Sequence, residues 1–202
     1  MRNGTLRELL VEQLRDMYNM ENQLVKALPK MAEAANSGDL SSAFEEHLEQ
    51  TRGHVQRLEQ AFDELGVATK GKKCLGMEGL IDEGKEILEE DLAPDTLDAG
   101  IIGAAQKVEH YEIAAYGTAR THAQLLGLDS VAQLLEETLE EEKQTDQKLT
   151  ELAQEINPQA ELGSEEAETS TAGRRRSVAG NGETDDDETS SRRTRTRVSS
   201  RS

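Results

Sequence analysis

The sequence predicts an all-α protein organised as a four-helix bundle. Apolar residues recur at intervals of three and four along four long segments, which is the spacing of one buried helix face. The chain has no Trp and only five other aromatic residues, so aliphatic side chains must fill the core. Short turns join the first two segments and the last two, which implies two antiparallel helical hairpins.

The first predicted helix covers residues 5–35. Thr5 and Glu8 have the spacing of a capping box, which marks a helix start. Pro29 lies inside the helix, and we expect a kink there because the apolar spacing resumes after it. One stripe, interrupted by a carboxylate, runs along this helix: Leu6, Leu10, Leu14, Met17, Glu21, Leu24 and Leu28.

The second predicted helix covers residues 41–65, with Asp39 or Ser41 as its N-cap. Thr51 and His54 interrupt its apolar stripe at the midpoint. Polar residues in the middle of a buried stripe need partners, so both positions are candidates for a site inside the bundle.

About 30 residues separate the second long helix from the third, and residues 74–90 within them have the pattern of a shorter helix. The third long helix covers residues 95–126, and the fourth covers residues 129–156 and ends at Asn157-Pro158. One long middle connection is typical of ferritin-like bundles. We therefore predict a ferritin-like four-helix bundle with an extra short helix in the long crossover between helices 2 and 3.

An internal repeat supports the two-hairpin arrangement. A shift of 91 residues places Glu21 on Glu112, and it also aligns the second helix with the fourth. Because one offset serves both hairpins, we expect a pseudo-twofold axis with Glu21 and Glu112 facing each other across it.

Charge separates a folded body from a tail. The 202 residues carry a net charge of −18, of which residues 1–160 hold −17 from 32 acidic and 15 basic side chains. This acidity argues against contact of the folded domain with nucleic acid or an anionic membrane. Residues 161–202 are rich in Arg, Ser and Thr, and we predict that they form a disordered tail. Only this tail could contact nucleic acid, through the arginines of residues 192–201.

The single cysteine, Cys74, excludes an intramolecular disulfide framework and a cysteine-rich zinc site. No apolar run reaches the length of a membrane span, and the N-terminus lacks a signal-peptide pattern. We expect a cytoplasmic protein.

Two carboxylates in the third helix are the first sign of a metal site. Glu109 and Glu112 lie three residues apart and share one helix face, beside the buriable residues Ala105, Val108 and Tyr116. Desolvation and mutual repulsion oppose two ionised carboxylates in a bundle interior, and a hard metal ion removes both penalties. The alternative is a helix rotated so that both glutamates reach solvent.

Residues on the other helices complete a candidate dinuclear site. Ferritin-like dimetal proteins use one Glu from each of two helices and a Glu-x-x-His motif from each of the other two. Residues 51–54 keep only the His of this motif, and residues 142–145 keep only the Glu. Such a carboxylate-rich set suits iron or manganese better than zinc or copper. The predicted metal ligands are Glu21, His54, Glu109, Glu112 and Glu142.

Four motifs resemble the YciF family of bacterial stress proteins: MYNMENQL at residues 17–24, CLGMEGLI at 74–81, AQKVEHYEIA at 105–114 and LEEEK at 139–143. The resemblance covers about residues 5–157. It implies a ferritin-like helical fold, a dinuclear metal site and a homodimer, in proteins associated with stress responses and without an established substrate.

The first functional hypothesis is a metal-binding stress-response protein with dinuclear iron or manganese and redox activity toward peroxide or oxygen. Tyr18 or Tyr111 would provide a phenol near the metal. A third possibility, an iron-storing cage, has no support in the sequence.

The alternative is a non-catalytic structural or interaction protein on the same scaffold. In it, Glu109 and Glu112 pair with Arg120, Lys107 or a partner chain. The incomplete Glu-x-x-His motifs favour this alternative, and so does the acidic run that contains Glu142, because most glutamates in such a run face solvent.

Overall fold

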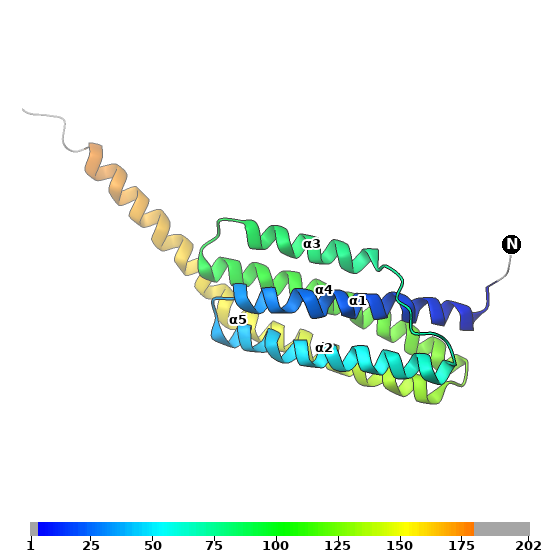
Figure 1. Cartoon of the computed structure of the whole chain (residues 1–202). Helices are drawn as coiled ribbons and strands as arrows, with labels where there is room; N and C mark the ends of the chain where they lie inside the picture. The colour runs from blue at the N-terminus through cyan, green and yellow to red at the C-terminus, as the bar shows by residue number, and fades with distance from the viewer. Residues whose placement is uncertain (1–3, 180–202) are drawn as a thin grey trace, which may run out of the picture. The chain divides into compact units, whose positions relative to one another are not determined.

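Figure 1 shows the computed structural model, which describes residues 4–179 and the side chains of residues 4–162. The all-α prediction is confirmed for this part of the chain, which contains no strand. The contacts within the chain divide it into two units, Met1–Ser164 and Glu165–Ser202. The helices are α1 (Leu6–Ala34), α2 (Gly38–Leu65), α3 (Leu75–Glu89), α4 (Pro94–Leu125) and α5 (Asp129–Ala179).

Within the first unit, α1 and α2 form one antiparallel hairpin, and α4 and the first part of α5 form a second (Figure 1). Residues 66–93 connect the hairpins and contain α3, which packs against α1 and α4. α2 and α4 therefore run in the same direction, because the long connection returns the chain to the end at which α2 begins (Figure 1).

The start of α1 follows the sequence prediction closely. Thr5 accepts a hydrogen bond from the Glu8 backbone N–H at 3.2 Å, and Glu8 Oε2 accepts one from the Thr5 N–H at 2.8 Å, so the capping box is formed. Pro29 lies inside α1, as predicted. The predicted N-cap of α2 is wrong, because Ser37 takes this role, accepting a hydrogen bond from the Leu40 N–H.

A buried carboxylate that the sequence did not reveal anchors the turn between α1 and α2. Asp98, on α4, accepts hydrogen bonds from the backbone N–H groups of Asn36 at 2.8 Å and Ser37 at 2.7 Å. These charge-assisted bonds satisfy two otherwise unpaired donors and attach the first hairpin to α4.

The predicted end of the last helix at Ile156 is wrong. α5 continues through Pro158 to Ala179, because Gln159, Ala160 and Glu161 after the proline favour helix and the backbone hydrogen bond that the proline removes lies in an exposed segment. The helix thus extends into the segment for which the sequence predicts disorder. Arginines 192–201 of the predicted tail lie outside the described residues.

The core is aliphatic, as the composition requires. Leu10, Leu14, Met20, Leu58 and Ile101 are at most 2% exposed, and Phe62 and Tyr116 are among the few buried rings. Among the described residues, no helix is long and apolar enough to cross a membrane.

Candidate metal centre

Six titratable side chains from four helices converge inside this core. None is more than 3% exposed. Their ligand-type atoms form two groups, in each of which all atoms lie within 4.8 Å of one another. Glu142 belongs to both groups and so lies between them. The first group is His47, Glu109, Glu112 and Glu142, and the second is Glu21, His54 and Glu142.

Helix periodicity explains this convergence. His47 and His54 lie seven residues apart on α2, which is two turns and therefore one face. Glu109 and Glu112 lie one turn apart on α4. Glu142 follows Leu135 and Leu139 on the buried stripe of α5, so the helix that buries these leucines also turns Glu142 inward.

The converging atoms lack hydrogen-bond partners. Eight buried atoms in the group have none: one oxygen each of Glu21 and Glu109, both oxygens of Glu112 and Glu142, Nε2 of His47 and Nδ1 of His54. Buried polar atoms of folded proteins are nearly always hydrogen-bonded. Eight unsatisfied atoms pointing to one place therefore fit a bound cation.

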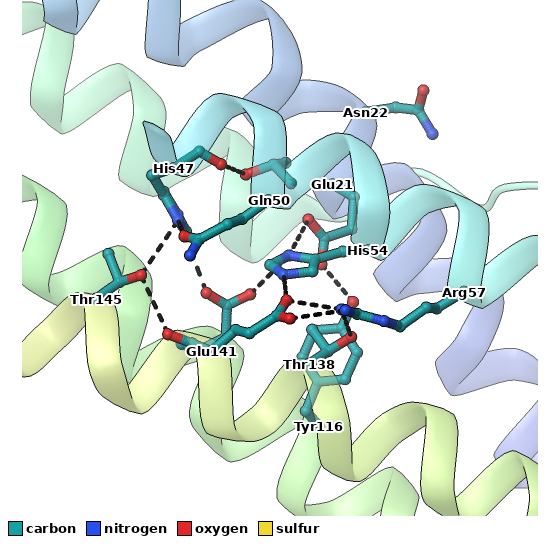
Figure 2. A network of polar contacts seen from close by, with 12 residues as sticks. Glu21, Asn22, His47, Gln50, His54, Arg57, Tyr116, Thr138, Glu141 and Thr145 are labelled. Atoms are coloured by element: carbon teal, nitrogen blue, oxygen red, sulfur yellow. Dashed lines mark hydrogen bonds and ion pairs between the residues drawn. The ribbon is translucent and has the colours of Figure 1, made fainter. Parts of the chain in front are cut away.

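Each histidine is oriented by a contact on its other ring nitrogen. His54 Nε2 lies 2.8 Å from Glu141 Oε2, and Arg57 binds both oxygens of Glu141 at 2.7 Å (Figure 2). With the proton on Nε2, the Nδ1 lone pair of His54 faces Glu142 at 3.0 Å and Glu21 at 3.6 Å. Metal-ligating histidines usually have this kind of carboxylate partner behind them.

His47 is oriented in the same way, but here Nδ1 contacts neighbouring side chains and Nε2 faces the cluster. Its Nδ1 lies 3.3 Å from Gln50 Oε1 and 3.3 Å from Thr145 Oγ1 (Figure 2). A proton on Nδ1 leaves the Nε2 lone pair toward Glu109, which is 3.4 Å away, and Glu142, at 4.0 Å. Both histidines can therefore offer a neutral nitrogen to the centre.

A buried phenol completes the surroundings. The hydroxyl of Tyr116, on α4, donates a short hydrogen bond to Glu21 Oε1 (Figure 2). The prediction that Tyr18 or Tyr111 lies at the site is wrong, because Tyr18 donates to Glu59 and Tyr111 contacts the buried Cys74.

The electrostatics of the cluster reflect a concentration of negative charge away from water. Burial raises the pKa of Glu112 well above its usual value, and the carboxylates of Glu142 and Glu21 raise it further. Burial also raises the pKa of Glu142 to about 7, although the histidines oppose the shift. In the metal-free protein, uptake of protons is therefore the available way to reduce the charge of the cluster.

The histidines are shifted in the complementary direction. Burial alone lowers the pKa of His47, but Glu109 and then Glu142 outweigh it and raise the pKa to about 9. For His54, burial lowers the pKa, but the hydrogen bond to Glu141 and then the nearby carboxylates of Glu142 and Glu21 outweigh it and raise the pKa to about 12. The same contact with His54 lowers the pKa of Glu141 to about 2.

The residues present fit a pair of hard or borderline cations. Four carboxylates and two imidazoles are the donor set of non-haem iron and manganese sites. The shared Glu142 can serve both positions. Each donor atom is aimed by its helix; in addition, each histidine donates its other ring N–H to a neighbouring side chain, and Glu21 accepts a hydrogen bond from Tyr116.

The structure brings together all five residues that the sequence predicts as ligands, and their role as ligands stays a prediction. The sequence interpretation missed His47, which lies 3.3 Å from Thr145, the residue found where the Glu-x-x-His spacing of the last helix would place a histidine. The pairing of Glu109 and Glu112 with Arg120 or Lys107 is wrong, because Arg120 pairs with Glu136 and Lys107 with Glu83.

A cavity of about 130 Å³ between α2 and α5 leads to His47. Its lining includes Gln50 and Thr145, which contact the His47 ring, and the exposed ion pair of Lys148 with Glu46 at 2.5 Å. A cavity of this size holds several water molecules, so a small solute can come close to the cluster from this side.

The fold and site define a helical bundle with a buried carboxylate–histidine centre. The chain belongs to the family described as "Domain of unknown function (DUF892)", which matches residues 5–161. It is 48% identical over 159 residues to protein YciF of Escherichia coli strain K12, a match that covers 78% of this chain and 96% of that protein. The resemblance to the YciF family is thereby confirmed.

Two solved structures are similar to this one. The crystal structure of the E. coli stress protein YciF matches with a TM-score of 0.72 and 47% identity, over 76% of this chain and 96% of that chain. YcfI of Rhodopseudomonas palustris, provisionally described as a structural protein, matches with a TM-score of 0.72 and 44% identity, over 74% and 96% of the two chains.

Proposed function

We propose that this chain is a stress-response protein that binds a dinuclear iron or manganese centre within a ferritin-like four-helix bundle, with α3 as the extra helix of the long crossover. One observation carries the proposal: eight buried ligand-type atoms without hydrogen-bond partners converge between four helices. The similarity to a stress protein supports the biological role.

The two ligand groups suggest how the ions are held. His47, Glu109 and Glu112 would hold one ion, Glu21 and His54 the other, and Glu142 both. Two such ions would supply the electrons for reduction of peroxide or oxygen. The chain itself excludes bulk water, fixes the protonated nitrogen of each imidazole, and holds the Tyr116 proton against Glu21.

Metal binding is tested by removing metal with a chelator, adding manganese(II) or anaerobic iron(II), and measuring bound metal by elemental analysis after gel filtration. We expect two ions per chain in the wild type. Glu112→Gln should lower this number, whereas Glu140→Gln should not, because Glu140 is an exposed residue paired with Lys143. A chain that retains no metal, or a Glu112→Gln variant that retains all of it, contradicts the proposal.

Redox activity is tested separately, by following peroxide and oxygen consumption by the loaded protein. The alternative function, a non-catalytic structural or interaction protein, is favoured by the description of the R. palustris relative. Metal binding without consumption of either oxidant would support that alternative. We also propose that the chain forms a homodimer, as the resemblance to the YciF family implies, and light scattering tests this.

A further inference from the structure

A second cavity lies between α1, α3 and α4. It has a volume of about 240 Å³. Its apolar walls include Leu24, Met31, Leu80, Ile81 and Val108. No residue of the metal cluster lines it, so it is distinct from the candidate metal centre.

The charged residues that line this cavity are opposite in sign to the net charge of the protein. Residues 1–160 carry a net charge of −17, yet the charged residues that line the cavity are Lys26, Lys30 and Lys85. Lys85 pairs with Asp82 at 2.6 Å. Lys26 and Lys30 lie one turn apart on α1, are exposed, and have no hydrogen bond or ion pair with any other residue whose side chain the structure describes.

We propose that this cavity binds the carboxylate of a medium-chain fatty acid, with the hydrocarbon chain between α1, α3 and α4 and the carboxylate at Lys26 and Lys30. A mostly apolar pocket lined by a few polar or charged side chains is typical of small-molecule sites. A dry cavity of about 150 Å³ accommodates benzene, so 240 Å³ accommodates a chain of roughly eight to ten carbons.

The two halves of the ligand can be tested independently by isothermal titration below the micelle concentration. Each added methylene that enters the cavity should strengthen binding about fourfold from hexanoate upward, until the cavity is full near decanoate. Decanol has the chain without the charge, and butyrate has the charge with little chain. Both should bind more weakly than decanoate.

Variants test the location. Lys26→Ala with Lys30→Ala should weaken decanoate binding roughly 2- to 30-fold, the range for two exposed ion pairs. Lys70→Ala with Lys72→Ala removes the same charge from exposed positions before α3 and is the matched control. Gly84→Leu should block the chain, and a Cβ at Gly84 would lie 3.8 Å from Ala104 Cβ, an ordinary contact that the fold tolerates.

Three results would overturn the proposal: no decanoate binding by the wild type, affinity independent of chain length, or equal affinity in the wild type and the paired Lys26 and Lys30 variant. If these lysine changes instead alter the oligomeric state seen by light scattering while decanoate does not bind, the surface is an interface between copies of the chain. Because both lysines are exposed, their replacement leaves the core intact and the test does not depend on Gly84→Leu.

Discussion

Replacing Glu142 with Gln should have opposite effects in the metal-free and metal-loaded protein. Glu142 is fully buried, both of its oxygens lack partners, and it is shared by the two ligand groups. Burial raises its pKa from 4.5 to about 7. Ionising it in the folded, metal-free protein at pH 8 therefore costs about 3 kcal/mol, at about 1.4 kcal/mol per pKa unit.

Gln cannot ionise, so Glu142→Gln should remove this cost. With chelator present, we expect the variant to be more stable than the wild type by about 3 kcal/mol at pH 8, but only by about 1 kcal/mol at pH 5, where the folded state keeps its proton. Comparing the two pH values cancels pH-independent changes in packing. For a chain of this size the difference at pH 8 corresponds to roughly 6–12 °C in Tm.

With saturating manganese(II), the order should reverse. The wild type gains about 4.1 kcal/mol when free metal is about 1,000 times Kd, which exceeds the cost of about 3 kcal/mol at pH 8, whereas a variant that has lost its central ligand gains little. Urea unfolding followed by circular dichroism measures both conditions. Glu140→Gln on the same helix is the control, and it should change stability by no more than about 0.5 kcal/mol. If Glu142→Gln behaves like this control with chelator and with metal, the reasoning about the buried cluster is refuted.

Three further predictions concern the surroundings of the cluster. His54→Ala should weaken metal binding at least tenfold in competition with a chromophoric chelator, whereas His122→Ala should not, because the His122 ring contacts Gln13 at 2.8 Å outside the cluster; equal retention would mean that His54 is not a ligand. Tyr116→Phe leaves the acceptor on Glu21 unsatisfied and should lower metal-free stability by about 1–3 kcal/mol in urea unfolding; an unchanged midpoint would contradict the observed hydrogen bond. Because the pKa values of Glu142 (about 7) and His47 (about 9) are raised, the folded metal-free protein holds protons that the unfolded chain has lost. The stability that these two groups contribute is therefore greatest below their unfolded pKa values and should fall as pH rises through about 7 and then about 9, while the stabilisation by metal should grow over the same range because ligands must lose protons; a pH-independent stabilisation by metal would contradict this.

The predicted part of the site is the part that helix periodicity determines. Leu135, Leu139 and Glu142 follow one another by four and three residues, so the apolar stripe itself indicates which glutamate of an acidic run is buried. The same reasoning applies to Glu21, which replaces an apolar residue in the stripe of α1.

His47 was missed because the interpretation matched a three-residue motif spacing to residues 51–54. Its position seven residues before His54 was the available signal, since seven residues return to the same helix face. The carboxylate behind His54 and the phenol beside Glu21 come from other helices, and their pairing depends on the relative rotation and height of the helices. No local spacing in the sequence contains that information.

The helix boundaries also differ in how far local sequence signals determine them. The capping box of Thr5 and Glu8 is a local signal, and the prediction based on it agrees with the structure. Pro158 was interpreted as a stop, although Pro29 was correctly expected to lie within a helix. A proline removes one backbone hydrogen bond in either case, and the surrounding sequence decides whether the helix continues.

The central claim is tested most directly by anomalous scattering from crystals grown without chelator in the presence of manganese(II) or iron(II). We predict two anomalous peaks between α1, α2, α4 and α5, separated by roughly 3.5–4 Å, with Glu142 contacting both ions. A map without a peak among the six converging side chains, or with metal bound only at the exposed carboxylates, would contradict the proposed dinuclear centre.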